Sequence, residues 1–249
     1  MQFVQGLPHG VYVGQTQIEH PAMRDAKDEA FRGFNLALHV GDEAARVQQH
    51  RMQLLTDFAA FGVDKISWLN QTHSTDVHTI NPELMLSART GDGLVTQTQG
   101  HALMMMTADC LPVVLGNADA TEVANLHAGW KGLAQGIVEN TIAHMQTQPT
   151  WAWLGAAISQ THFEIGAEVK RAFCEKYPTL EGAFVEGKAA DKFYADLYAI
   201  ARYILAEHGI TQIYGGDQCS YAQQAQYYSY RRAAKTGRMA TFVFIAKSC

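Results

Sequence analysis

Apolar positions follow two patterns along the chain, one helical and one typical of strands. From Asp42 to Phe61, apolar residues recur at intervals of three and four, which predicts a helix capped by Asp42 and ended by Gly62. Short apolar runs separated by Gly, Asp, Asn and Pro follow and are typical of strands. These runs are Ile66–Leu69, Val77–Ile80, Leu94–Thr96, Ala102–Met106, Val113–Leu115 and Glu122–Leu126.

The second half of the chain alternates helical and strand patterns. The helical patterns cover Trp130–His144, Gly166–Tyr177 and Asp191–Glu207, and the strand patterns cover Trp151–Ile158, Gln212–Tyr214 and Ala240–Ala246. We find no Pro- or Ser-rich linker and no convincing repeat in the sequence. The pattern therefore predicts one mixed α/β domain over residues 1–249.

Composition narrows the class of protein. The 249 residues are 47% hydrophobic and 17% charged, enough for a full core, and the net charge of −5 argues against a nucleic-acid or anionic-membrane surface. The four cysteines, Cys110, Cys174, Cys219 and Cys249, lack the spacing of a small disulfide scaffold. No signal peptide or membrane-spanning run is recognisable. We expect a soluble cytoplasmic protein.

Three residues carry the candidate chemistry, because each lies where a predicted strand gives way to a turn. They are His73, Cys110 and His127. Two imidazoles and one thiolate are the ligand set of a catalytic zinc site that keeps its fourth position open. A closed structural site would normally need four protein ligands, often including a Cys-x-x-Cys pair, which this chain lacks. The pattern favours an open metal site.

An ordinary structural role competes with this interpretation. The chain has 11 histidines, and those other than His73 and His127 are interpreted as surface or hydrogen-bonding residues. Cys110 could be a buried, inert thiol, although the polar Asp109 precedes it and Pro112 is expected to stop strand pairing just after it. His127 differs because small residues and a predicted helix start follow it, which lets backbone approach a ligand closely. Spacing alone leaves both interpretations open.

Several segments together resemble one family. They are Phe34–Asp42, Gln71–His73, Asp92–Thr96, Thr107–Pro112, His127–Gly132, Leu154–Ile158, Ser229–Arg232 and Lys235–Arg238, in the family's order from about residue 30 onward. The chain resembles the YfiH-like, or laccase-domain, family of purine nucleoside phosphorylases. It differs from the usual family pattern at Ser74, at Lys131 and over Ser159–Gly166, which concerns the substrate-facing wall and not the three ligands.

The resemblance implies a fold, a metal and an activity. The fold is a single α+β domain in which two packed mixed β-sheets are flanked by helices, a four-layer α-β-β-α sandwich. The metal is zinc on His73, Cys110 and His127, with copper as a reported possibility for the family. The activity is phosphorolysis of adenosine, inosine and S-methyl-5′-thioadenosine to free base and sugar 1-phosphate, together with adenosine deamination.

Roles for the remaining site residues follow as hypotheses. Arg51 and Lys131 are the first candidates for holding phosphate, and Arg231, Arg232 and Arg238 are reserves. Asp109 could orient a metal ligand or act as a general acid/base, and such supporting groups typically change affinity or activity by about 10–100-fold. The expected partners are a nucleoside and phosphate, without nucleic acid or membrane, and the expected state is a monomer or weak homodimer.

Three alternatives stay open. A copper-dependent polyphenol oxidase could use a thioether from Met104–Met106, but the sequence has no His-x-His or His-Cys-His group. A metal-free cysteine hydrolase would pair Cys110 with His127 or His73. A non-catalytic role in quality control of cell-wall precursors, also proposed for relatives, would need no reaction at all.

Overall fold

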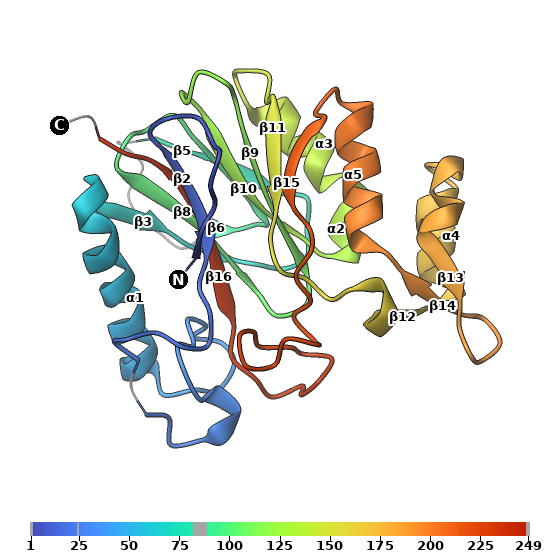
Figure 1. The fold of residues 1–249 in the computed structure, drawn as a ribbon, viewed down its shortest axis with the longest axis horizontal. Helices are drawn as coiled ribbons and strands as arrows, with labels where there is room; N and C mark the ends of the chain where they lie inside the picture. Colours follow the sequence, from blue (N-terminus) through green and yellow to red (C-terminus); the bar gives the residue numbers. More distant parts are fainter. Residues whose placement is uncertain (1, 24, 82–88, 248–249) are drawn as a thin grey trace.

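Two large β-sheets lie face to face at the centre of the molecule, and helices cover their outer surfaces (Figure 1). The computed structural model describes residues 2–23, 25–81 and 89–247. Both large sheets contain parallel as well as antiparallel pairs. The α+β class expected from the sequence is confirmed.

The first large sheet has the strand order β1-β2-β16-β8-β3. Its members are β1 (Gln2–Phe3), β2 (Val11–Gln15), β16 (Met239–Ile245), β8 (His101–Thr107) and β3 (Lys65–Ser67). All pairs are antiparallel except β3 with β8. Every residue of β8 and β16 is buried, which explains why both are almost continuously apolar. The sequence patterns did not predict β1 and β2.

The second large sheet has the order β15-β11-β9-β10-β7-β5. Its members are β15 (Gln212–Gly215), β11 (Trp151–Leu154), β9 (Leu111–Gly116), β10 (Val123–Ala128), β7 (Gly93–Thr96) and β5 (Val77–Ile80). The pairs at its two edges are parallel and the central pairs are antiparallel. The prediction for Val77–Ile80 is confirmed at both ends, whereas the strand predicted over Trp151–Ile158 ends at Leu154.

Two small sheets complete the strand inventory of the described residues. One is β12 (Glu164–Gly166), β14 (Lys192–Ala195) and β13 (Phe184–Glu186), in the order β12-β14-β13, and the other pairs β4 (Leu69–Asn70) with β6 (Arg89–Thr90). The strand predicted over Ile66–Leu69 is thus divided between β3 and β4, which belong to different sheets.

The core between the large sheets is built by alternation of side chains along each strand. On β8, Leu103 and Met105 face the second sheet, while Ala102 and Met104 face the opposite layer. On β10, Val123 lies in the inter-sheet core and Leu126 faces the helices. By the same alternation His127 shares the inner face of β10 with Val123. The His127 side chain therefore lies on the same side of the second sheet as the core between the two sheets.

Helix α1 (Ala44–Phe58) covers the outer face of the first sheet. Leu54 and Phe58 pack there against Phe242 and Phe244. A 3-10 turn (Ala59–Phe61) extends the helix to Gly62, whose φ of 74° ends it as expected. Asp42 does not cap the helix as predicted, because its side chain instead binds Arg46 and Asn35; the N-cap residue is Glu43.

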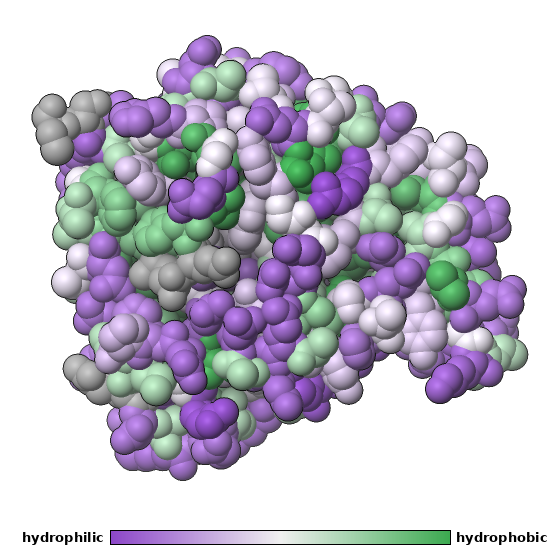
Figure 2. Space-filling view, in the orientation of Figure 1, coloured by the Kyte–Doolittle hydropathy of each residue, from purple (hydrophilic) through white to green (hydrophobic). Residues whose placement is uncertain are grey.

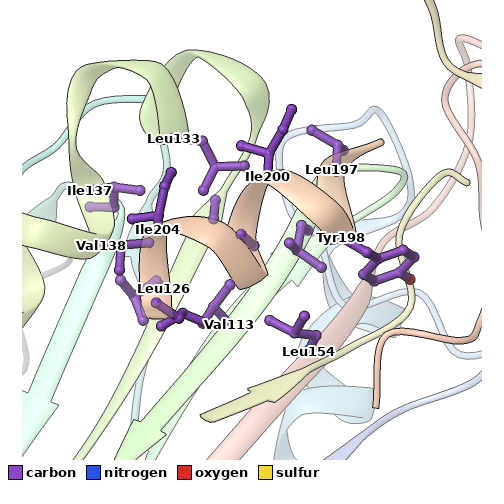
Figure 3. Close-up of a cluster of buried hydrophobic side chains, with 14 of the residues drawn as sticks. Val113, Leu126, Leu133, Ile137, Val138, Leu154, Leu197, Tyr198, Ile200 and Ile204 are labelled. Carbon is purple, nitrogen blue, oxygen red and sulfur yellow. The ribbon is translucent and has the colours of Figure 1, made fainter. Parts of the chain in front are cut away.

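The outer face of the second sheet is covered by α2 (Trp130–Gln135), α3 (Ile137–His144) and α5 (Leu197–Glu207), with α4 (Ala167–Cys174) beside them. In Figure 3, Ile200 and Ile204 of α5 lie over Val113 and Leu126 of the sheet. The helix predicted over Trp130–His144 is interrupted at Gly136, whose φ is 100°. Short 3-10 turns occupy Glu29–Phe31, Gln160–His162 and Pro178–Ala183.

Two further predictions are wrong. The helix predicted from Asp191 begins at Leu197, because Phe193 and its neighbours pair as β14 between β12 and β13, and Asp196 then caps α5. Pro112 does not stop strand pairing. It lies inside β9 opposite His127, and its carbonyl accepts a hydrogen bond from the Gly155 amide.

The face seen in Figure 2 is mainly hydrophilic, with hydrophobic residues in separate patches. The exposed large hydrophobic residues of the described chain are Met23, Leu38, Met52, Val185 and Tyr230. None of the helices among the described residues is both long and apolar enough to cross a bilayer.

Candidate metal centre

His73 lies in the loop after β4, in a left-handed backbone conformation with φ of 59°. This conformation is uncommon outside glycine and has to be held by its surroundings. The buried carboxylate of Asp92 holds it, accepting hydrogen bonds from the amides of Thr72 and His73, both at 3.1 Å, and of Ser74 at 2.7 Å. Three consecutive amides of the loop therefore bind one carboxylate, and this fixes the backbone position from which the His73 side chain extends.

The same carboxylate orients His127. Asp92 Oδ1 lies 2.7 Å from His127 Nδ1, and the Asp92 carbonyl accepts from the His127 amide at 2.8 Å. With Nδ1 engaged, Nε2 is the ring nitrogen left for a metal, which is the usual carboxylate–histidine–metal arrangement. Asp92 thus serves two candidate ligands, one in the loop after β4 and one on β10. The sequence patterns did not predict this role, although Asp92 begins one of the segments that resemble the family.

Cys110 occupies the turn between β8 and β9, and its sulfur completes the group. The candidate ligand atoms of His73, Cys110 and His127 all lie within 4.8 Å of one another, and Cys110 Sγ is 3.6 Å from His73 Nε2. Tetrahedral zinc with ordinary bond lengths places neighbouring donors about 3.3–3.6 Å apart. The three side chains therefore form a His/Cys/His group that could hold a metal ion. Within residues 2–23, 25–81 and 89–247 it is the single group of this kind.

Charge in the metal-free group favours the Cys110 thiolate and the protonated His127 ring, whose proton a metal ion would have to displace. Burial alone would raise the pKa of Cys110, but the neighbouring His127 and His73 lower it to about 6. Burial likewise disfavours the charged form of His127, yet Cys110 and Asp92 raise its pKa to about 9. The pKa of Asp92 falls to about 2, because hydrogen bonds from His127 and Ser74 outweigh its burial. The thiolate that a metal requires is thus stabilised before a metal binds.

Gly129 leaves space for the candidate ligands because it has no Cβ atom. A Cβ atom on this residue would lie 3.0 Å from Cys110 Sγ and 3.1 Å from His73 Cδ2. Its φ of −63° is ordinary, so space and not backbone conformation requires glycine here. Gly129 thus lets the backbone after His127 come close to two of the candidate metal ligands.

The three residues open onto a cavity of about 430 Å³. Its lining combines aromatic side chains, cations and apolar groups: His39, Gln71, His73, Met106, Thr107, Ala108, Asp109, Cys110, His127, Trp130, Lys131, Ile158, Phe163, Tyr230, Arg231 and Arg238. This volume is within the range of small-molecule sites. His39, interpreted as a surface or hydrogen-bonding residue, is exposed and also lines the cavity; partial burial, Arg238 and Arg51 lower its pKa.

The candidate phosphate-binding cations are divided by the structure. Lys131, Arg231 and Arg238 line the cavity, whereas Arg51 does not. The Arg51 guanidinium lies 4.2 Å from the centroid of the Trp68 ring and donates to the Leu36 carbonyl at 2.9 Å. The Arg232 guanidinium donates hydrogen bonds to nearby backbone carbonyls, which belong to Ser220, Tyr221 and Tyr227.

Asp109 lies next to Cys110 but points to other partners. Its carboxylate accepts hydrogen bonds from Ser220 Oγ, Ser229 Oγ and the Arg231 amide, at 2.7, 3.0 and 2.7 Å. The orienting role expected of Asp109 toward a ligand is filled for His127 by Asp92. Asp109 instead connects the Cys110 turn to the segment that carries Tyr230 and Arg231.

The remaining cysteines lie away from the group. Cys174 is in α4, and Cys219 accepts hydrogen bonds from Ser159. Cys110, Cys174 and Cys219 are free thiols, while Cys249 lies outside the described residues.

Comparison with known proteins identifies the family to which the chain belongs. Residues 23–246 match the family model described as multi-copper polyphenol oxidoreductase laccase. The purine nucleoside phosphorylase YfiH of Escherichia coli (strain K12) is 41% identical over 218 residues, which cover 86% of this chain and 87% of the relative. The chain belongs to the YfiH-like, laccase-domain family. Adenosine deaminase RL5, from an unknown prokaryotic organism, is a further relative, 32% identical over 231 residues, covering 86% and 88% of the two chains.

A solved structure supports the YfiH-like fold independently. The crystal structure of a Neisseria meningitidis protein of the family DUF152 superposes with a TM-score of 0.91 at 37% identity, covering 99% of each chain. The membership rests on nearly the whole chain and not on the segments of the three candidate ligands alone.

Proposed function

We propose that this protein is a zinc-dependent purine nucleoside phosphorylase with adenosine deaminase activity. The observation that carries the proposal is the His73/Cys110/His127 group at the wall of a cavity that also presents cations and aromatic rings. The names of relatives support the reaction, since YfiH of E. coli is a purine nucleoside phosphorylase and RL5 is an adenosine deaminase. Adenosine, inosine and S-methyl-5′-thioadenosine are the proposed substrates.

In phosphorolysis a phosphate oxygen forms a bond to C1′ of the ribose, and the C1′–N9 bond breaks with its electron pair going to the purine. Lys131 and Arg231 are proposed to hold the phosphate, with Arg238 in place of Arg51, because these cations line the cavity and Arg51 does not. Phe163 and Tyr230 offer ring faces for the purine. Fixed cations in a partly dehydrated cavity would stabilise the charge of phosphate in the transition state.

His73, Cys110 and His127 are proposed as the zinc ligands, and the 3.6 Å between Cys110 Sγ and His73 Nε2 suits that ion. A zinc ion held there would supply Lewis acidity to a reactant at its open coordination position. Asp92 keeps the His127 ring in the orientation that presents Nε2, and it holds the His73 loop. In the deamination reaction water replaces the 6-amino group of adenosine and ammonia leaves.

The test uses protein of measured metal content, incubated with adenosine in the presence and absence of phosphate. Adenine and ribose 1-phosphate should form together and only with phosphate, whereas inosine should form by deamination in both conditions. Hypoxanthine should appear later and only with phosphate. Metal-loaded protein that forms none of these products would contradict the proposal.

The same protein separates the alternatives. Copper at one or more equivalents, with oxidase turnover matching nucleoside turnover, would favour a polyphenol oxidase; Met106 lines the cavity as a possible thioether ligand. Activity that survives a chelator would favour a cysteine hydrolase using Cys110. Binding of a cell-wall precursor by a variant without the three ligands would favour the quality-control role.

Further proposals concern the molecule as a whole. We propose that residues 1–249 form one YfiH-like domain and that its packing is a four-layer α-β-β-α sandwich, supported by the separate cores on either face of each large sheet. We also propose a cytoplasmic location, supported by the free thiols, and a monomer or weak homodimer, supported by the scattered exposed hydrophobic residues.

A further inference from the structure

Asp109 is anchored to a segment more than a hundred residues away in the sequence. Oδ1 accepts a hydrogen bond from Ser220 Oγ at 2.7 Å, and Oδ2 accepts from Ser229 Oγ at 3.0 Å and from the Arg231 amide at 2.7 Å. Ser220 and Ser229 are fully buried, so these donors are shielded from competing water. Both oxygens of the carboxylate are thus used as acceptors within the protein.

The contacts to Oδ2 fix one aromatic side of the cavity. Ser229 and Arg231 are bound to the same oxygen atom, and Tyr230 lies between them in the chain. Tyr230 lines the cavity although it is 57% exposed. The Asp109 carboxylate therefore holds the chain on both sides of Tyr230.

The same anchor extends to a second aromatic ring. The Arg231 guanidinium donates to the carbonyls of His162 at 3.3 Å and Glu164 at 3.0 Å, the residues on either side of Phe163. It also lies 5.5 Å from the centroid of the Phe163 ring. One carboxylate next to Cys110 is thus connected to Tyr230 and Phe163 through a short series of hydrogen bonds.

The backbone of Asp109 shows that its position is imposed. Its φ is 94°, a left-handed value that residues other than glycine adopt infrequently, and its carbonyl accepts from the Ile158 amide at 2.9 Å. Each oxygen of the carboxylate also faces at least one donor, so the side chain is held as firmly as the backbone.

We infer that Asp109 is a positioning residue, which fixes Tyr230 and Phe163 as the two aromatic walls for the purine. The part that concerns the purine rests on the proposed function, and the part that concerns the two rings does not.

Two substitutions at Asp109 separate the roles. In Asp109→Asn the amide oxygen can still accept from Ser229 and Arg231, while the amide nitrogen faces the Ser220 hydroxyl, which can accept. Asparagine also tolerates left-handed φ values. Asp109→Gly permits the φ of 94° but removes every side-chain acceptor.

The steady-state kinetics of phosphorolysis give the first readout. Asp109→Asn should keep kcat and the nucleoside KM within about threefold of wild type, whereas loss of a general acid/base costs about 10²–10⁴-fold. Asp109→Gly should raise the nucleoside KM by about tenfold or more with a smaller change in kcat, as expected when ring stacking is lost. A fall of kcat by two orders of magnitude or more in Asp109→Asn, at unchanged KM, would overturn the inference.

Hydrogen exchange of residues 227–238, measured without substrate, gives a readout independent of the reaction. Exchange there should be faster by about tenfold or more in Asp109→Gly, and close to wild type in Asp109→Asn. Ser229→Ala, which leaves the Arg231 contact in place, should give an intermediate rate and supports the test if the glycine variant folds poorly. Unchanged exchange in both Asp109→Gly and Ser229→Ala would overturn the inference. A wild-type protein without phosphorolysis would refute the proposed function, while the exchange rates would still decide whether Asp109 positions Tyr230.

Discussion

At the scale of single residues, two buried carboxylates divide the organisation of the site between them. Asp92 holds the His73 loop and the His127 ring, and Asp109 holds the segment of Tyr230. Asp92 holds a loop in which His73 has positive φ, and the backbone of Asp109 itself has positive φ. Strain of this kind persists only where surrounding contacts over-determine it. The two carboxylates supply those contacts.

Replacing Asp92 tests whether this carboxylate supports the candidate metal ligands. Each Asp92 oxygen accepts from at least two donors, so in Asp92→Asn the amide nitrogen must face a donor whichever way it turns. The zinc affinity should fall by about 10–100-fold, measured by competition with a chromogenic chelator. The control is Asp119→Asn, at an exposed turn position. Unchanged zinc affinity in Asp92→Asn would show that the hydrogen bonds do not support the ligands.

Cys110 is the ligand whose loss should matter most, because it supplies both a donor atom and negative charge. Cys110→Ala should lose bound zinc and phosphorolysis together, the latter by about 10³-fold or more if the metal is needed for the chemical step. Metal analysis and product formation are measured on the same preparation. Cys174→Ala, in α4 and outside the cavity lining, should keep both. A Cys110→Ala protein with zinc and full activity would refute the ligand assignment.

At the scale of elements, the start of α2 decides how close the chain can come to the metal group. Gly129→Ala would place a methyl group 3.0 Å from Cys110 Sγ and 3.1 Å from His73 Cδ2. The backbone conformation there suits alanine, so the melting temperature of the metal-free protein should change little. Zinc affinity should fall by about tenfold or more, because the ligand atoms must move apart. Equal zinc affinity in the variant and the wild type would contradict this prediction.

The junction between α2 and α3 depends on a different property of glycine. Gly136 has a φ of 100°, where a Cβ atom costs about 1–2 kcal/mol, so Gly136→Ala should lower the free energy of unfolding by about that amount. Urea denaturation measures the change. Gly182→Ala is the matched control, since no positive φ constrains Gly182 and a Cβ atom added there would meet no other atom within 4 Å. A loss of stability in the control as large as in Gly136→Ala would remove the conformational explanation.

The elements also show what local patterns can and cannot predict. Val77–Ile80 and the α1 region follow their sequence periodicity because packing agrees with it. Lys192–Ala195 has a helical pattern but forms β14, since two neighbouring strands provide hydrogen bonds that periodicity does not record. That His73, Cys110 and His127 come together could be predicted, because His and Cys close to strand ends are chemically distinctive. Asp92 could not, because its role appears only when β7 and β10 are paired.

At the scale of the whole molecule, the basic side chains that line the cavity are opposite in sign to the net charge of the protein. The net charge is −5, yet Lys131, Arg231 and Arg238 line one cavity. Local cations in a partly enclosed site attract phosphate even when the protein is acidic. This feature depends on residues from α2 and from the segment before β16 that only the tertiary fold brings together.

The hydrophobic cores are built without the metal group. The clusters between the sheets and beneath the helices contain none of His73, Cys110 and His127. The fold should therefore persist after metal removal, unlike that of a zinc finger, which unfolds without its ion. The residues that stabilise the fold are thus separate from the three candidate metal ligands.

Metal removal should accordingly lower stability without unfolding the protein. A ligand that binds only the folded state at 100 times its Kd adds about 2.7 kcal/mol, which corresponds to about 5–11 °C in Tm for a domain of this size. The metal-free protein should keep its far-UV circular dichroism and gain this Tm on addition of zinc, whereas Cys110→Ala should show no zinc-dependent gain. An unfolded metal-free protein would show that the cores alone do not sustain the fold. A zinc-dependent gain in Cys110→Ala equal to wild type would place the stabilising ion elsewhere, because only binding to the native site can depend on that thiolate.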